Sequence, residues 1–138
     1  WYTPRYHGWS LGAMLGHLNL SDNLGLLQIQ LAMRGLNLRL SSTMWDRFNN
    51  FTTRIFQRRV VTASLQSMDN NLPRIAEFIR KLKVEVFTRD VFYPPANKNV
   101  TLEQAVQVYF LFHWRQHLET MQQTEQQLAT LNGESETD

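Results

Sequence analysis

Two histidines with helical spacing are the residues of this chain best suited to metal chemistry. His113 and His117 lie in the segment His-Trp-Arg-Gln-His, and side chains four residues apart share one face of a helix. Both imidazoles could therefore reach one metal ion. A zincin-type hydrolase has a glutamate directly after its first histidine to activate water, but Trp114 stands there. The spacing therefore allows metal binding and disfavours metal-dependent hydrolysis.

Further ligands for this pair cannot be placed from the sequence. The remaining candidates are His7, His17 and Glu119. Two histidines at helical spacing also arise easily by chance in a chain that has four histidines. The simpler interpretation is that His113 and His117 are packed or surface side chains, so we expect no metal and no other cofactor.

Potential nucleophiles and acid–base groups do not indicate catalysis. The chain has no cysteine, which excludes disulfides, thiolate metal sites and cysteine nucleophiles. Its glycine-rich start lacks the Gly-Lys-Ser/Thr sequence of a phosphate-binding loop. Most carboxylates outside the C-terminal tail fall where helix capping or ion pairing accounts for them. We assign no catalytic residue and expect a protein that is not an enzyme.

Basic side chains form the strongest binding candidate in the sequence. The formal net charge is +2, and three of the twelve acidic residues fall in the last six positions, so the remainder is clearly basic. Candidate contacts for nucleic acid or an acidic partner are Arg47, Arg54, Arg58, Arg59, Arg80, Lys81 and Lys83. If the two helices that carry these residues were adjacent and antiparallel, their basic faces would merge into one patch suited to phosphates.

Aromatic rings crowd the first nine residues, and apolar residues continue late in the last predicted helix. Large rings of this kind anchor protein contacts when they find a pocket. Candidate contacts for a protein partner or a second copy are Trp1, Tyr2, Tyr6, Trp9, Leu118 and Met121. The leading functional hypothesis is a helical module for protein–protein association, part of a larger protein or complex. Nucleic-acid binding is the alternative, and a steep salt dependence would distinguish it.

The segment 101–132 is the longest run with helical periodicity and without glycine or proline. Thr101 and Gln104 fit a capping box at its start, and Gly133 follows its end. Its first half is apolar on every side, which predicts burial. We therefore expect Phe112 to lie in the core.

Three more helices are predicted upstream, over residues 23–34, 43–68 and 74–83. In the second, the apolar side chains of Met44, Phe48, Phe51 and Ile55 share one quadrant, which we expect to pack inward. Asp69-Asn70-Asn71 should end this helix, with Pro73 in the first turn of the next. Short alternating or β-branched segments at 36–40, 84–86 and 91–93 leave room for a minor two-stranded element, and Pro94-Pro95 predicts an extended linker.

The sequence as a whole predicts a mainly α fold, an irregular bundle of about four helices. Residues 1–20 form an extended aromatic arm in this prediction, residues 21–132 the helical domain, and residues 133–138 a disordered acidic tail. Three glycines four residues apart make a helix in the arm weak, although they would let another helix approach closely. No apolar run approaches the roughly 20 residues of a membrane span, and no signal peptide is visible, which favours an intracellular protein.

Overall fold

The computed structural model describes residues 2–134 and confirms the mainly α fold with a minor two-stranded sheet. Trp1 and residues 135–138 of the predicted tail lie outside the described part. The long helices are α1 (Leu11–Met33), α2 (Ser42–Phe56) and α3 (Val61–Arg80). The C-terminal helical run consists of α4 (Leu102–Gln107), a π-helical turn η3 (Val108–Phe112) and α5 (His113–Glu134). Between them lie η1 (Val84–Val86), β1 (Asp90–Tyr93), η2 (Pro94–Ala96) and β2 (Lys98–Thr101).

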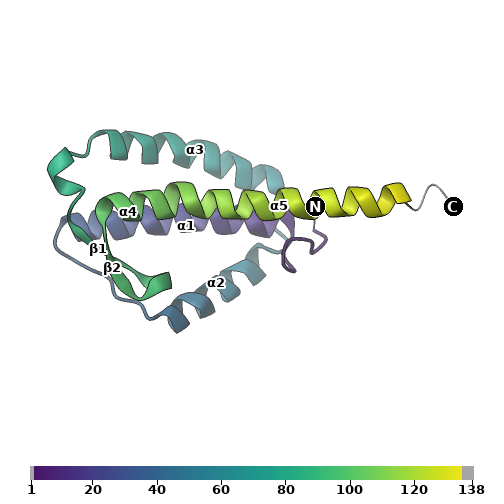
Figure 1. Cartoon of the computed structure of the whole chain (residues 1–138), viewed down its shortest axis with the longest axis horizontal. Coiled ribbons are helices and arrows are strands. Elements are labelled where there is room, and N and C mark those ends of the chain that lie inside the picture. The colour runs from purple at the N-terminus through teal and green to yellow at the C-terminus, as the bar shows by residue number, and fades with distance from the viewer. Residues whose placement is uncertain (1, 135–138) are drawn as a thin grey trace.

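Helix α1 and the α4–η3–α5 run form the central pair of the molecule (Figure 1). They run antiparallel, with α3 on one side and α2 on the opposite side, while the β-hairpin closes the end where α4 begins. Both α2 and α3 pack mainly against α1. Among the described residues, no helix combines the length and the apolar character that crossing a bilayer would require.

Helix α1 begins twelve residues earlier than predicted. Ser10 caps it by accepting a hydrogen bond from the Ala13 amide, and most residues from Gly12 to Leu18 are buried. The prediction of an extended arm over residues 11–20 was therefore wrong. Its glycines allow close packing, because a Cβ on Gly16 would lie 2.9 Å from Cγ of Phe56. Burial against α2 and α3 thus outweighs the low helix propensity of glycine.

The predicted helix over 43–68 is two helices, α2 and α3, with a turn at 57–60. Gln57 holds this turn against the start of α1, since its backbone carbonyl accepts from Oγ of Ser10 at 2.9 Å. The predicted break at Asp69-Asn70-Asn71 was also wrong, because α3 continues through it with Pro73 inside. Asn71 donates to the Asn19 side-chain oxygen at 2.5 Å, which ties this stretch of α3 to α1.

The β-hairpin replaces the extended linker expected at Pro94-Pro95. β1 and β2 pair antiparallel with Val91 opposite Val100, and η2 forms the turn between them. Asn97, the residue that follows η2, adopts a left-handed backbone conformation (φ 49°). Of the three predicted extended segments, only 91–93 is a strand. Residues 36–40 have no regular structure, and 84–86 form a 3-10 turn.

The helical run after β2 confirms the predicted capping box of Thr101 and Gln104. The prediction that Phe112 lies in the core was wrong, since its side chain is 47% exposed. The wider π-helical turn advances each residue by a smaller angle, so Tyr109 faces α1 while Phe112 points away. The buried cluster on this side of the molecule consists of Ile29, Ala32, Val91, Leu102, Ala105 and Tyr109.

Helix α2 presents its apolar quadrant to solvent rather than to the core. Phe51 is 63% exposed and Ile55 59% exposed, whereas Trp45, Thr52 and Thr53 are buried. The expectation that this quadrant packs inward was therefore wrong. Where α2 meets the glycine face of α1, the ring of Phe56 packs on Gly16, and the apolar stripe remains outside.

Candidate metal centre

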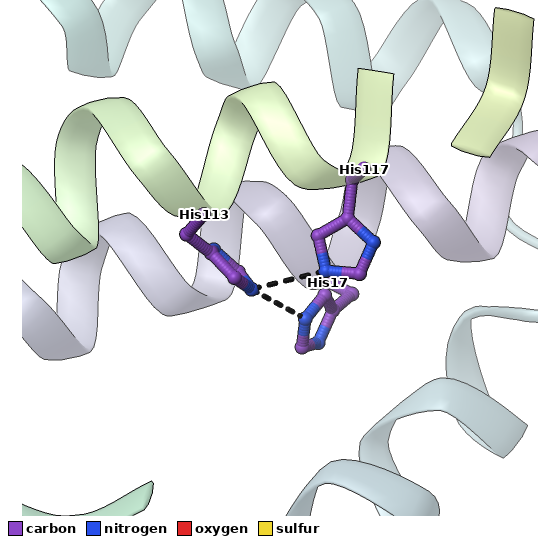
Figure 2. Close-up of side chains that lie close together, drawn as sticks. All are labelled: His17, His113 and His117. Atoms are coloured by element: carbon purple, nitrogen blue, oxygen red, sulfur yellow. Dashed lines mark hydrogen bonds between the residues drawn. The ribbon is translucent and has the colours of Figure 1, made fainter. Parts of the chain in front are cut away.

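Three histidines from two helices converge on one point beside the central helix pair (Figure 2). His17 comes from α1, and His113 and His117 come from successive turns of α5. Nε2 of His113 lies 3.1 Å from Nε2 of His17 and 3.1 Å from Nε2 of His117. One ligating nitrogen of each ring lies within 4.8 Å of the other two. The structure thus adds His17 to the pair that the sequence singled out.

A nitrogen separation of 3.1 Å fits both a hydrogen bond and a metal site, but the two contacts that Nε2 of His113 makes favour a metal site. Two imidazole nitrogens bound tetrahedrally to zinc at 2.0–2.1 Å lie about 3.3 Å apart. Without an ion, Nε2 of His113 carries either one proton or one lone pair, so it cannot form two good hydrogen bonds at once. A cation at the point of convergence would satisfy the lone pairs of all three rings.

Burial keeps the three imidazoles neutral, which is the form that binds metal ions. It lowers the pKa of His17 to about 3, and repulsion from His113 and His117 lowers it further in the same direction. It also lowers the pKa of His113 to about 4, with His117 as the second cause. The pKa of His117 is lowered as well, first by burial and then by His7. No proton therefore competes with a cation at neutral pH.

In His17 and His113, the opposite ring nitrogen lacks the acceptor that often supports metal-bound histidine. Ligation through Nε2 leaves the proton on Nδ1, and within residues 2–134 Nδ1 of His17 and of His113 is buried without a hydrogen-bond partner. The rings are instead held by packing. Trp9 meets His17 edge-on with centroids 5.0 Å apart and stacks on His117 at 6.2 Å.

The buried carboxylate of Asp22 fixes the position of α5 along α1 beside the histidines. The indole nitrogen of Trp114 donates to both carboxylate oxygens of Asp22, at 2.9 and 3.0 Å, and so joins α5 to α1 next to His113. Burial raises the pKa of Asp22 to about 6, although the bond from Trp114 acts in the opposite direction. The π-helical turn η3 ends immediately before His113. Together these features align the α5 histidines with His17.

A pocket of about 560 Å³ opens in front of the histidines, between α2 and the η3–α5 run. Its walls carry aromatic side chains from four segments, Trp9, Trp45, Tyr93 and Tyr109, and the amides of Asn49, Asn50 and Gln116. All three histidines line it as well. An ion bound by them would therefore be accessible from a space large enough for a small molecule.

The predicted basic residues do not form one patch. Helices α2 and α3 lie on opposite sides of α1, so Arg47 and Arg54 are far from the basic end of α3 (Figure 1). Arg59 donates to the hydroxyls of Ser64 and Ser67. Arg80 and Lys81 both pair with Glu77. The adjacency on which the nucleic-acid hypothesis depended was therefore wrong.

The predicted aromatic contacts are divided between the core and the surface. Tyr6 is buried and donates from its hydroxyl to Glu125 on α5 at 2.6 Å. Trp9 packs on the histidines, while Tyr2 is exposed. Leu118 is 50% exposed and Met121 half-buried. Of these residues, Tyr2 and Leu118 are accessible to a partner, and Trp9 and Met121 are partly accessible.

One sequence pattern that suggests catalysis proves to be structural. Residues 8–12 read Gly-Trp-Ser-Leu-Gly, which fits the Gly-x-Ser-x-Gly pattern of hydrolase nucleophiles. Ser10, however, is fully buried, donates to the Gln57 carbonyl and caps α1. The context that a nucleophile requires, an exposed serine on a strand-to-helix turn, is not present at this residue.

His17 is the site residue that sequence reasoning could not place. Its signal was only that it is one of four histidines, 96 positions before His113. Comparisons with protein-family models, with curated proteins and with solved structures gave no match. The interpretation of the three histidines therefore depends on their geometry.

Proposed function

We propose that this domain binds a divalent transition-metal ion through Nε2 of His17, His113 and His117. The observation that carries the proposal is the convergence of three imidazoles whose ligating nitrogens lie within 4.8 Å of one another, with Nε2 of His113 3.1 Å from Nε2 of each of the other two, close to the separation in a tetrahedral site. Imidazole ligands suit zinc, copper, iron and nickel, whereas magnesium and calcium prefer oxygen. The chain has no cysteine, so thiolates do not compete for the ion.

Three protein ligands leave a coordination position for an external ligand. Structural zinc sites are usually closed by four protein ligands, while sites with three keep one position for water or substrate. Here the histidines line the pocket between α2 and the η3–α5 run, so the free position would face it. A bound ion would polarise a small molecule that entered there, as a Lewis acid.

Metal titration of the chelator-treated protein tests the proposal. We expect one equivalent of Co²⁺ or Zn²⁺ to bind at pH 7.5, with Co²⁺ giving the visible absorption of a low-coordinate nitrogen site. His17→Gln and His117→Gln should each weaken binding by at least about 100-fold, because each leaves only two imidazoles. Circular dichroism checks that the variants fold.

Glu119→Gln is the matched control for this titration. Glu119 lies on α5 two residues after His117 and was a candidate ligand from sequence, but it is exposed and not part of the histidine cluster. Its replacement should leave the affinity unchanged. Absence of binding to the wild-type protein, or equal loss in the control, would contradict the proposal.

Protein–protein association through α5 is a second candidate. The observation that favours it is the exposure of Leu111 and Leu118, seven residues apart on the same helical run, at 47% and 50%. Sedimentation velocity should show a concentration-dependent species that Leu118→Glu removes. A wild-type monomer at tens of micromolar that captures no protein partner would contradict this candidate.

A further inference from the structure

The outward face of α2 is an apolar stripe without a covering element among the described residues. Its four side chains are spaced at i, i+4, i+7 and i+11 and are 38–63% exposed: Met44, Phe48, Phe51 and Ile55. Exposed apolar stripes of this size are costly in water unless a partner covers them. The stripe points away from the pocket, because α2 turns Trp45, Asp46 and Asn49 toward the pocket instead.

Arginines border this stripe on one side. Arg47 and Arg54 project from α2 and Arg58 from the turn after it, and all three are exposed. None of them has an ion-pair partner within residues 2–131. The only acid in the segment 42–58 is Asp46, which lines the pocket on another face of the helix. The surface is therefore apolar at its centre and positive along one edge.

We propose that this face of α2 docks on an anionic lipid surface. Helices that lie in a bilayer interface combine exposed Phe, Leu or Ile side chains with flanking Arg or Lys, and anionic lipids attract the basic edge. α2 is the outermost helix on its side of the molecule, so a flat surface can reach it (Figure 1). The helix contacts such a surface without spanning it.

Charge argues against a second copy of the chain as the occupant. A twofold axis that pairs antiparallel copies of α2 keeps both arginine rows on the same edge of the interface, where like charges repel. Nucleic acid would match the charge, and Phe48 and Phe51 offer rings, but Met44 and Ile55 at the two ends of the stripe add apolar surface that base stacking does not use. A lipid surface matches both the whole apolar centre and the basic edge.

Vesicle co-sedimentation tests the proposal with the full chain. Vesicles of phosphatidylcholine alone are compared with vesicles containing about one third phosphatidylglycerol, at low salt and at about 0.5 M salt. We expect binding to the anionic vesicles only, and release at high salt. Arg54→Gln should lower the partition coefficient about fivefold, and Phe51→Ser about tenfold or more.

Two exposed residues on the η3–α5 run, away from α2, provide matched controls. Phe112 is as accessible as the stripe residues and Arg115 is exposed, but both lie on the η3–α5 run. Phe112→Ser and Arg115→Gln should leave vesicle binding unchanged. The proposal is overturned by no binding, by equal binding to neutral vesicles, or by equal loss in the controls. Dimerisation or nucleic-acid binding that Phe51→Ser abolishes, without vesicle binding, would assign the face to those partners instead.

Discussion

At His17, burial and the two neighbouring imidazoles act on the same equilibrium in the same direction. Each disfavours the imidazolium, so the ring remains neutral and presents a lone pair to the point where the three rings meet. The sequence shows none of this, because the pKa of a histidine depends on what surrounds it. The sequence did indicate the His113–His117 pair, because residues four positions apart on one helix lie on the same face.

The neutral histidines predict that the metal-free domain loses stability in mild acid. In the unfolded chain histidines take up protons near pH 6.5, whereas folded His17 and His113 stay neutral down to about pH 3 and 4. Between these limits the unfolded chain binds more protons, so the free energy of unfolding falls as pH falls. Asp22 acts in the opposite direction below about pH 6, because its pKa is raised.

The net effect is at least about one proton, or roughly 1.4 kcal/mol per pH unit between about pH 6 and 4. Urea denaturation of the chelator-treated protein at several pH values measures it. His17→Gln should make the decline shallower. A free energy of unfolding that is flat or rises as pH falls over this interval would show that the histidines are not neutral in the folded state.

At the scale of elements, features set by neighbouring residues could be predicted, whereas helices stabilised by packing against distant residues could not. The capping box at Thr101 requires only neighbouring residues, and it was confirmed. The glycines of α1 argued against a helix by propensity, yet they permit contacts that stabilise one. A Cβ at Gly25, for example, would lie 2.5 Å from Cγ of Tyr109. The π-helical turn likewise has no sequence signature that we could identify.

The π-helical turn should tolerate a deletion that the neighbouring helix does not. η3 places five residues where an α-helix places four, with the His113 amide bonded to the Val108 carbonyl. Deleting Leu111, which is exposed, should convert this turn to α-helix while the α5 histidines keep their position. Deleting Gln116 should instead rotate His117 away from His113, because it falls between them.

Co²⁺ titration of the two deletion variants, with circular dichroism as the folding check, measures this difference. The variant lacking Leu111 should bind within about tenfold of wild type, and the variant lacking Gln116 at least about 100-fold more weakly. Loss of binding in both would mean that η3 itself is required for the site.

At the scale of the whole molecule, the mainly helical character could be predicted, but several helix boundaries and inward faces could not. The apolar quadrant of α2 lies outside, and Phe112 is exposed. Periodicity shows that a helix has an apolar face, but the packing of neighbouring helices decides which face is covered. The candidate site follows the same rule, since the approach of α1 to α5 brings His17 to the pair.

The revised core predicts a sharp contrast between two apolar residues. Ile29 is fully buried in the cluster with Val91 and Leu102, so Ile29→Ala should lower the free energy of unfolding by about 2–5 kcal/mol. Phe112→Ala should lower it by less than about 1 kcal/mol, because the ring is 47% exposed. Denaturant melts of both variants measure the difference, and a larger loss for Phe112→Ala would mean that the core is misplaced.

X-ray absorption spectroscopy at the metal edge of the zinc-loaded protein tests the metal site most directly. We predict three imidazole nitrogens at about 2.0 Å around one zinc ion, with a further light-atom ligand at the open position. The same spectrum recorded from His17→Gln should show fewer imidazoles. A first shell of oxygen alone, or an imidazole count that His17→Gln does not change, would contradict the assignment of His17, His113 and His117 as the ligands.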